Sequence, residues 1–270
     1  MSLAPSKSAP TAEPAFDLDY SIHDFEIDPH ADSQFLFRRI EEAMLREGAI
    51  AGGRTLDVAC GAGQLAARVR DHGGEGWGLD PSPEMLGISR WLVPADHVVL
   101  VRGLAEQLPF RDGSFDRVIC QGSLDHFVDP SAFISEAARI VRPEGRVVIA
   151  LANYRSLSCR LGQLAQDVGE AWFGRRSIDH RPYWVPPPDH FHLGDLRFVR
   201  RLGGRSLRLE RCYGISLLWL LRSYWGDWRW GAWLDSLPRP FVQSFLTTLD
   251  TIGQRVPALA DMIVSVWQPR

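Results

Sequence analysis

The 270-residue sequence has no long apolar run, no excess of positive charge and no paired cysteine motif. Its longest strongly apolar stretch near the C-terminus, residues 215–221, is too short to cross a bilayer, which takes about 20 residues. The net charge of −3 argues against a nucleic-acid-binding protein, whose surface usually carries a basic stripe. The four cysteines stand far apart, so the sequence predicts neither a metal site nor a disulfide framework.

The beginning of the chain lacks the long apolar core of a signal peptide. Residues 1–15 are rich in Ser, Ala and Pro, and they are predicted to be a disordered tail. Scattered cysteines of this kind are typical of reduced thiols, so the sequence predicts a cytoplasmic protein.

Strand-like and helix-like segments alternate after this tail. Because short loops join them, the pattern predicts a doubly wound α/β fold in which helices cover both faces of a mostly parallel, seven-stranded sheet. Such sheets bind ligands at the carboxyl ends of their strands. The first five strands are expected at residues 55–59, 76–79, 97–101, 115–120 and 146–151, and the helices at 32–46, 64–71, 82–91 and 131–141.

The alternation ends after residue 151, which divides the chain. Residues 16–151 are predicted to form the cofactor-binding core, and residues 152–192, which show no clean period, a cap over the substrate. Residues 193–270 are predicted to belong to the same domain as the core. They would contribute a last helix and a pair of strands with a Trp-rich helical insertion between them. The two strands are expected at 206–212 and 262–267.

The most informative stretch is the first strand and the turn after it. The strand carries Asp57, and Gly61 and Gly63 follow in a turn that lets a ligand approach the main chain. Asp57 can bind an ammonium group, and unpaired amides at the next helix favour a carboxylate. Asp80, at the end of the second strand, is placed to accept the two hydroxyls of a ribose.

Residues 61–66 also match a loose dinucleotide fingerprint, which by itself is a weak signal. Asp57 would set a negative charge near the pyrophosphate of a dinucleotide, and Ala66 stands at the third glycine position. Both features count against a nicotinamide cofactor.

Five segments occur in an order and spacing that resemble the class I S-adenosylmethionine-dependent methyltransferases, particularly those that act on small molecules. The resemblance covers roughly residues 50–151, with a weaker continuation to about 213. The segments are residues 57–63, 78–86, 103–110, 115–121 and 139–146.

This resemblance implies S-adenosylmethionine as the cofactor and S-adenosylhomocysteine as the product. Ala59 replaces the first glycine of the family's loop, and Leu104 stands where the family often has an acid that binds the adenine amine. The cofactor-binding positions implied by the family are Asp57, Ala59, Gly61, Gly63, Asp80, Pro81, Met85, Leu104, Ala105, Glu106, Gln121 and Gly122. The residues expected to line the acceptor are Tyr20, Tyr154, Tyr183, Trp184 and His190.

His126, just beyond the fourth strand, is the candidate general base, needed only if the acceptor loses a proton, as a hydroxyl does. The alternative is a helix-capping or packing histidine. Asp125 is predicted to be solvated or to cap a helix. His190 and His192, with Asp195, have a spacing compatible with a metal site, but a role in the loop or cap is favoured and no metal is predicted.

Five tryptophans lie between Trp219 and Trp233, among arginines. Tryptophan combines an apolar body with a polar N–H and suits interfaces and pocket walls. Three interpretations stay open for this segment: a surface that contacts a membrane or a lipid-like substrate, a dimer interface, or a small helical core over the sheet.

The sequence as a whole predicts a methyltransferase that transfers a methyl group from S-adenosylmethionine to a small, apolar or aromatic acceptor. Oxygen is favoured over nitrogen or carbon by analogy with the family. The alternatives are an NAD-dependent oxidoreductase and a non-catalytic, cofactor-binding regulatory module. A monomer or a homodimer without nucleic acid is expected.

Overall fold

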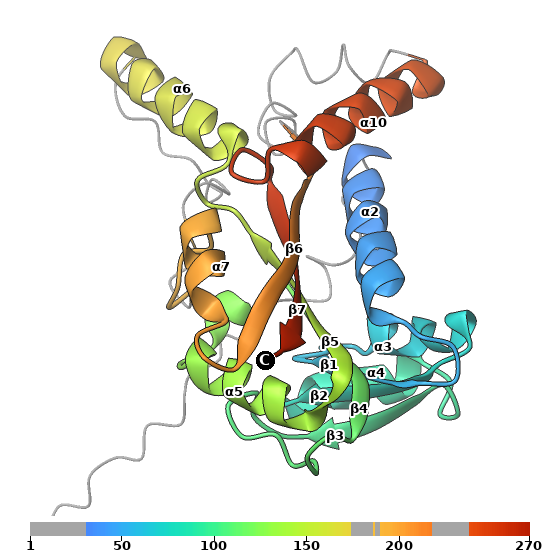
Figure 1. The fold of residues 1–270 in the computed structure, drawn as a ribbon. Helices are drawn as coiled ribbons and strands as arrows, with labels where there is room; N and C mark the ends of the chain where they lie inside the picture. Colours follow the sequence, from blue (N-terminus) through green and yellow to red (C-terminus); the bar gives the residue numbers. More distant parts are fainter. Residues whose placement is uncertain (1–30, 174–185, 187–189, 218–237) are drawn as a thin grey trace, which may run out of the picture.

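The computed structural model describes residues 31–173, 186, 190–217 and 238–270 (Figure 1). The predictions for the tail over residues 1–15, for Tyr20, Tyr183 and Trp184, and for the segment from Trp219 to Trp233 lie outside the described residues.

The centre of the structure is a seven-stranded sheet with the order β3-β2-β1-β4-β5-β7-β6. Neighbouring strands from β3 to β5 are parallel, whereas β7 is antiparallel to both β5 and β6. The predicted doubly wound, mostly parallel sheet with a closing strand pair is therefore confirmed. The strands are β1 (Arg54–Val58), β2 (Glu75–Asp80), β3 (Val98–Arg102), β4 (Phe115–Gln121), β5 (Val141–Ala152), β6 (Leu207–Ile215) and β7 (Met262–Pro269).

Helices cover both faces of the sheet. On one face, α2 (Ala31–Gly48) packs its buried apolar side against β4, β5 and β7, and α3 (Gln64–Arg68) and α4 (Pro83–Leu92) lie beside β1 to β3. On the other face, α5 (Pro130–Ile140) and α7 (Leu196–Leu202) complete the larger core. Val118 and Cys120 of β4 belong to the core on the side of α5, whereas Ile119 between them belongs to the core on the side of α2. This alternation is expected of a strand that is buried on both faces.

Two helices lie beyond the sheet. Helix α6 (Leu157–Phe173) follows β5, and α10 (Arg239–Arg255) precedes β7, so both start or end at the carboxyl end of β5 (Figure 1). The sequence pattern missed α6, because residues 152–192 show no clean apolar period. None of the described helices is long and apolar enough to cross a bilayer.

Two further boundaries differ from the prediction. The helix expected over residues 64–71 is five residues of α3 followed by a short 3₁₀ turn, η1 (Arg70–His72). The strand expected from residue 146 begins at Val141. The pairing of β4 with β5 moves from Phe115 opposite Val141 to Arg117 opposite Arg146, so the register shifts at an irregularity within β5. Ser82 caps α4, because its Oγ accepts the backbone N–H of Met85 at 3.2 Å.

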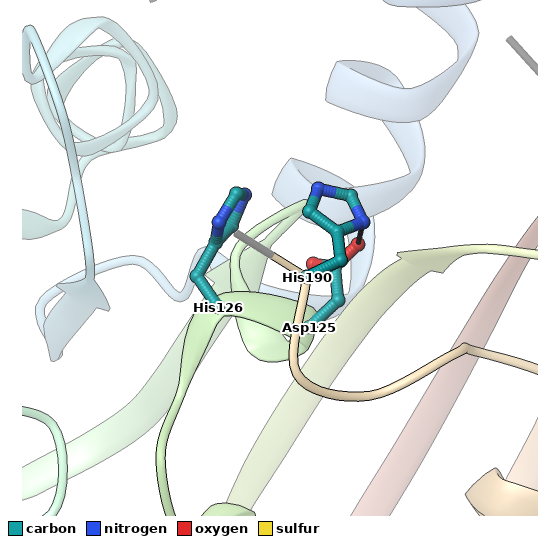
Figure 2. A group of neighbouring side chains, drawn as sticks. All are labelled: Asp125, His126 and His190. Atoms are coloured by element: carbon teal, nitrogen blue, oxygen red, sulfur yellow. Dashed lines mark ion pairs between the residues drawn. The ribbon is translucent and has the colours of Figure 1, made fainter. Parts of the chain in front are cut away.

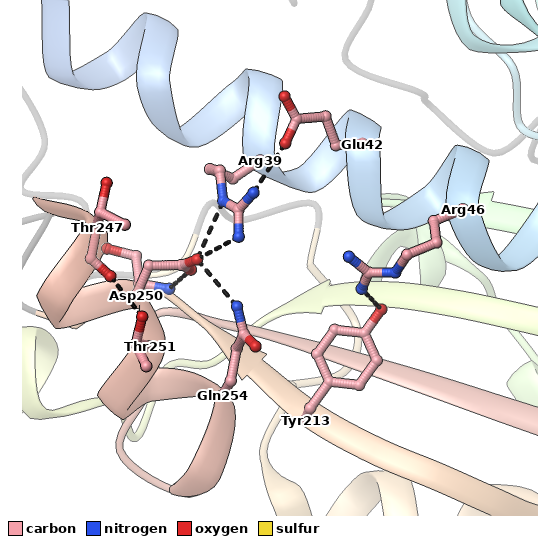
Figure 3. A network of polar contacts seen from close by, with 9 residues as sticks. Arg39, Glu42, Arg46, Tyr213, Thr247, Asp250, Thr251 and Gln254 are labelled. Atoms are coloured by element: carbon pink, nitrogen blue, oxygen red, sulfur yellow. Dashed lines mark hydrogen bonds and ion pairs between the residues drawn. The ribbon is translucent and has the colours of Figure 1, made fainter. Parts of the chain in front are cut away.

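A buried carboxylate connects α2, α10 and the end of β6 (Figure 3). Oδ2 of Asp250 accepts hydrogen bonds from Arg39 Nε at 3.0 Å, Arg39 Nη2 at 2.7 Å and Gln254 Nε2 at 3.1 Å. Oδ1 accepts the backbone N–H of Ser216 at 3.0 Å. Arg39 also reaches Glu42 at 2.8 Å, but that carboxylate is half exposed. The two partners of Arg39 therefore differ in burial.

We expect Asp250→Ala to lower the free energy of unfolding by about 3 kcal/mol, because it leaves Arg39 and the Ser216 amide without their buried partner. Chemical denaturation measures this loss. Glu42→Ala removes the exposed partner of the same arginine and should change the free energy of unfolding by less than about 0.5 kcal/mol. Equal losses in the two variants would contradict the assignment of the carboxylate as a buried connection.

Candidate functional site

The candidate site begins in the turn between β1 and α3. The backbone of Ala59 (φ 57°), Gly61 (φ 52°) and Gly63 (φ 74°) is left-handed, a conformation that glycine adopts readily and alanine does not. At Gly63 a side chain is also excluded, since an added Cβ would lie 2.3 Å from Ser89 Oγ in α4. Ala59 therefore holds a strained backbone at the position where the resembling family has glycine.

The carboxylate of Asp80 fixes this turn to the end of β2. Asp80 Oδ2 accepts the backbone N–H of Gly61 at 2.8 Å, and Oδ1 accepts the backbone N–H of Ser82 at 2.9 Å. Each oxygen uses one lone pair in these bonds and keeps another for a ligand. Asp80 therefore has two tasks, since it shapes the turn and offers two acceptors to a pair of hydroxyls.

The amides of the turn are not bare, contrary to the expectation from the sequence. Gly61 N–H donates to Asp80, Gly63 N–H donates to Cys60 O at 2.9 Å, and Cys60 N–H donates to Leu79 O at 3.0 Å. With only five residues in α3, the predicted anion site at its N-terminus is also weaker than expected. The turn is preformed by its own hydrogen bonds, and its ligand-binding capacity lies mainly in the two carboxylates.

Asp57 and Asp80 are both buried, at 3% and 7% exposure. Burial, and secondarily the charge of Asp80, raise the pKa of Asp57 to about 8, while a backbone hydrogen bond with Ala66 opposes this rise. Burial also raises the pKa of Asp80, against its two backbone hydrogen bonds. Within the described residues, neither carboxylate forms an ion pair with an Arg or Lys. A cationic group of a ligand would therefore be favoured beside them.

Cys60 lies between these acids and is not a nucleophile. Burial, then the charges of Asp57 and Asp80, raise the pKa of its thiol above the ordinary range, so the group stays protonated. The prediction of free cysteines holds for all four, each of which is a free thiol in the structure.

The three predicted cofactor-binding residues in the segment after β3 differ from one another in exposure and in contacts. Leu104 is half exposed, Ala105 is buried, and Glu106 Oε1 accepts the backbone N–H of Val128 at 3.0 Å. Glu106 thus connects this segment to the loop before α5. At the end of β2, Pro81 lies between Asp80 and the cap Ser82. Met85 flanks the glycine turn, because its methyl carbon would lie 3.4 Å from a Cβ atom placed on Gly61.

The end of β4 offers an open position beside the turn. Gly122 has a left-handed backbone (φ 67°), and an added Cβ there would have no heavy atom within 4 Å. The buried Gln121 Oε1 has no hydrogen-bond partner within the described part of the chain. A buried acceptor without a partner is costly unless a ligand satisfies it, so this position fits a bound polar group.

A cluster of titratable side chains follows in η2 (Leu124–His126) and meets the loop at residue 190 (Figure 2). His190 Nδ1 lies 2.9 Å from Asp125 Oδ2 and 2.8 Å from Tyr154 Oη, and the rings of His126 and His190 pack edge to face with centroids 4.4 Å apart. The structure thus brings together three residues that the sequence predicted separately, His126, Tyr154 and His190.

The prediction for Asp125 is wrong. This residue was expected to be solvated or to cap a helix, yet its side chain is buried, at 6% exposure, against His190. The Asp-His order at the end of a central strand is the one signal that could have indicated it. His192, by contrast, stacks on Phe198 at 5.9 Å, and Asp195 caps α7, so the grouping of these two with His190 is not formed.

Hydrogen bonds place this cluster next to the glycine turn. Ser123 Oγ lies 3.5 Å from the carbonyl oxygen of Ala59, and the backbone N–H of Phe191 donates to the carbonyl oxygen of Asp125 at 2.9 Å. The edge of the sheet therefore has two adjoining parts. One has paired acids beside a preformed turn and suits a cation with a ribose. The other has a buried imidazole and carboxylate and suits proton transfer or a metal ion.

The pKa of Asp57 gives a test of the buried acids. A carboxyl whose pKa is raised in the folded protein contributes stability in acid that is lost as the pH rises from its unfolded value toward its folded one. The free energy of unfolding should therefore fall between about pH 4 and pH 8, by up to about 1.4 kcal/mol per pH unit. Asp57→Asn should remove this component of the slope, measured by urea denaturation across the window.

The exposed Asp71 provides the matched control, since its side chain is 60% exposed. Asp71→Asn should leave the slope as in the unaltered protein. If the Asp57→Asn curve ran parallel to that of the unaltered protein, the raised pKa of Asp57 would be contradicted.

Part of the chain is similar to known proteins. Residues 56–149 match the family described as a methyltransferase domain. An uncharacterized methyltransferase of Mycobacterium tuberculosis is 39% identical over 94 residues, which are 35% of this chain and 37% of that protein. A ubiquinone biosynthesis O-methyltransferase of Dechloromonas aromatica is 37% identical over 110 residues, 38% of this chain and 46% of that protein. The chain thus spans less than half the length of these curated relatives.

Solved structures agree over a longer range. A structure described as a complex between the Haloferax volcanii Trm112 methyltransferase activator and a putative methyltransferase has a TM-score of 0.56 at 20% identity, and the match covers 88% of this chain and 92% of that chain. Phosphoethanolamine N-methyltransferase 2 of Haemonchus contortus, in complex with S-adenosylmethionine, has a TM-score of 0.53 at 17% identity, with 85% of this chain and 52% of its own covered. These likenesses show the fold. Residues 56–149, which match a methyltransferase domain, lie within a chain of this fold.

Proposed function

We propose that this protein transfers a methyl group from S-adenosylmethionine to a small acceptor. The observation that carries the proposal is Asp80, a buried carboxylate at the end of β2 that holds the glycine turn with both oxygens and keeps an acceptor position on each. A ribose presents two adjacent hydroxyls, which such a carboxylate can bind together.

The other residues at this edge fit the remaining parts of the cofactor. Asp57, whose raised pKa a neighbouring cation would lower, would bind the ammonium group. The left-handed turn at Ala59, Gly61 and Gly63 would lie along the methionine part. The remaining predicted cofactor contacts fall into two groups. Pro81, Met85, Leu104, Ala105 and Glu106 would lie on the adenosine side, and Gln121 and Gly122 would lie beside the sulfur.

S-adenosylmethionine supplies a methyl group on a positively charged sulfur, which is a good leaving group. The task of the chain is to hold an acceptor atom close to that methyl group and in line with the bond that breaks. Such positioning alone can account for about 7–11 kcal/mol of the barrier. The preformed turn suits this task, because its hydrogen bonds already exist before a ligand arrives.

The acceptor is proposed to be small and apolar or aromatic, with oxygen as the methylated atom. The names of the ubiquinone biosynthesis O-methyltransferase relatives support such an acceptor. Tyr154, His126 and His190 border the site from the side of β4 and β5, where the acceptor would lie. Tyr20, Tyr183 and Trp184 stay predictions, as do the cytoplasmic location and a membrane role of the segment from Trp219 to Trp233.

The alternatives draw less support. A nicotinamide dinucleotide would place its pyrophosphate beside Asp57, a buried acid. A regulatory module without catalysis would have no use for the buried imidazole at the acceptor side. The methyltransferase family match also covers the turn itself.

Isothermal titration calorimetry tests the proposal. The unaltered protein should bind S-adenosylmethionine and S-adenosylhomocysteine but not NAD. Asp80→Asn keeps the shape and removes the charge, so it should weaken S-adenosylhomocysteine binding about 10-fold or more, in line with about 1.5–3 kcal/mol for a hydrogen bond to a charged group. Asp71→Asn, on the exposed 3₁₀ turn η1, should bind normally.

A protein that binds NAD and neither sulfur compound would overturn the proposal. Thermal unfolding of the Asp80 variant separates lost ligand contacts from a lost turn. The stabilisation of the protein by added S-adenosylhomocysteine, rather than the melting temperature without ligand, is the quantity to compare.

A further inference from the structure

Asp125 and His190 form a buried acid–imidazole pair at the acceptor side of the site (Figure 2). Their side chains are 6% and 5% exposed, and Asp125 Oδ2 lies 2.9 Å from His190 Nδ1. Asp125 comes from η2 after β4, whereas His190 comes from the loop that precedes α7. Two separate segments thus meet to form one contact.

The hydrogen bonds decide which nitrogen of His190 carries the proton. A carboxylate oxygen only accepts, so Nδ1 must carry the hydrogen that lies between it and Asp125. Tyr154 Oη, at 2.8 Å from the same nitrogen, then shares this hydrogen as a second acceptor. The tautomer is assigned from the contacts, and in the neutral ring it leaves Nε2 with an unprotonated lone pair.

His190 Nε2 is buried and has no hydrogen-bond partner within the described ranges, and the same holds for Asp125 Oδ1. An unsatisfied buried acceptor costs about 1–3 kcal/mol, so its retention indicates a ligand that satisfies it. A lone pair on nitrogen is satisfied by a donor. The matching ligand group is therefore one that carries an O–H or N–H.

The position of the pair connects it to the cofactor-binding edge. On one side, Ser123 Oγ lies 3.5 Å from the carbonyl oxygen of Ala59 in the glycine turn. On the other side, Glu106 accepts the backbone N–H of Val128, which follows η2. The loop with His190 is held against η2, since the backbone N–H groups of Phe191 and His192 donate to the carbonyl oxygen of Asp125 at 2.9 and 3.3 Å.

We propose that His190 is the general base of this site, that Asp125 is the residue that positions it, and that the methyl acceptor is a hydroxyl group. This inference rests on the proposed methyl transfer. The acceptor O–H gives its proton to His190 Nε2, and the oxygen uses the freed electron pair to bond the methyl carbon. The carbon–sulfur bond breaks, and its electron pair stays on sulfur as a neutral thioether.

Asp125 supports this step by orienting the ring and by stabilising the imidazolium that forms, because its carboxylate faces the N–H opposite Nε2. The described titratable groups that face His190 are Asp125, His126 and Tyr154. His126 packs the edge of its ring against His190, which fits the alternative of a packing histidine. The base is thereby moved from the predicted His126 to His190.

The same side chains could instead hold a metal ion, since donor atoms of Asp125, His126 and His190 lie within 4.8 Å of one another. A metal on Nε2 would claim the lone pair that the base needs, and a metal on Nδ1 would replace the proton that faces Asp125. The two hypotheses therefore make opposite predictions for the ring nitrogens of His190, and one experiment separates them.

The first test is nitrogen NMR of the histidine rings near pH 8 in full-length protein, with His190→Gln used to assign the signals. We expect Nδ1 protonated and Nε2 unprotonated in His190, and a mixture of tautomers in Asp125→Asn. The exposed His72 serves as the internal reference and should not change. A protonated Nε2, or a stoichiometric metal bound to either ring nitrogen of His190, would overturn the proposal.

The second test measures transfer of a labelled methyl group to catechol and to its diamine analogue, ortho-phenylenediamine. We expect the unaltered protein to place the label on catechol oxygen. His190→Gln should lower kcat about 100-fold, within the range for a general base. The activity of this variant should recover in part at high pH, where catechol ionises unaided. His192→Gln, two residues along the same loop, is the matched control and should keep its activity.

Label on nitrogen alone, or no transfer to oxygen by a protein that binds S-adenosylmethionine, would overturn the hydroxyl assignment and leave the proposed function intact. Failure of the unaltered protein to bind S-adenosylmethionine would overturn the proposed function instead, while the NMR result would still report on the Asp125–His190 pair.

Discussion

The hydrogen bond from the Gly61 backbone to Asp80 is the contact on which the site depends. It joins the turn after β1 to the end of β2 at 2.8 Å, and the second oxygen of the same carboxylate starts α4 through Ser82. One side chain therefore fixes the path of the main chain at three places. Without it, a turn with three left-handed residues would have fewer contacts to hold its strained backbone.

The sheet order explains why this contact forms where it does. The chain runs from β1 outward to β2 and β3, then returns to β4 on the other side of β1. Because these strands are parallel, their carboxyl ends lie along one edge, and the loops after β1 and β4 diverge there. Asp57, Asp80 and Gln121 are brought together for this reason, although more than sixty residues separate the first from the last.

Burial gives the acids at this edge their chemical character. Asp57 lies in a strand that is covered on both faces, and its pKa of about 8 reflects that burial before any effect of Asp80. The same core isolates Cys120 and keeps the pKa of its thiol well above the ordinary range. A large core thus supports a small polar site, and the cost of the buried charges is offset by the packing around them.

The sequence by itself determined the parallel strands, the glycine turn and the two acids, because strand period, glycine and a terminal acid are local signals. It did not determine α6, since the apolar residues of that segment follow no clear period before they are packed. It also predicted Asp125 to be solvated or to cap a helix, apart from His190. Their pairing at 2.9 Å depends on a loop that returns from beyond β5 to η2. The two residues are 65 positions apart in the sequence. Only the tertiary structure decides this contact, because burial and hydrogen bonds between distant segments are not encoded in a local pattern.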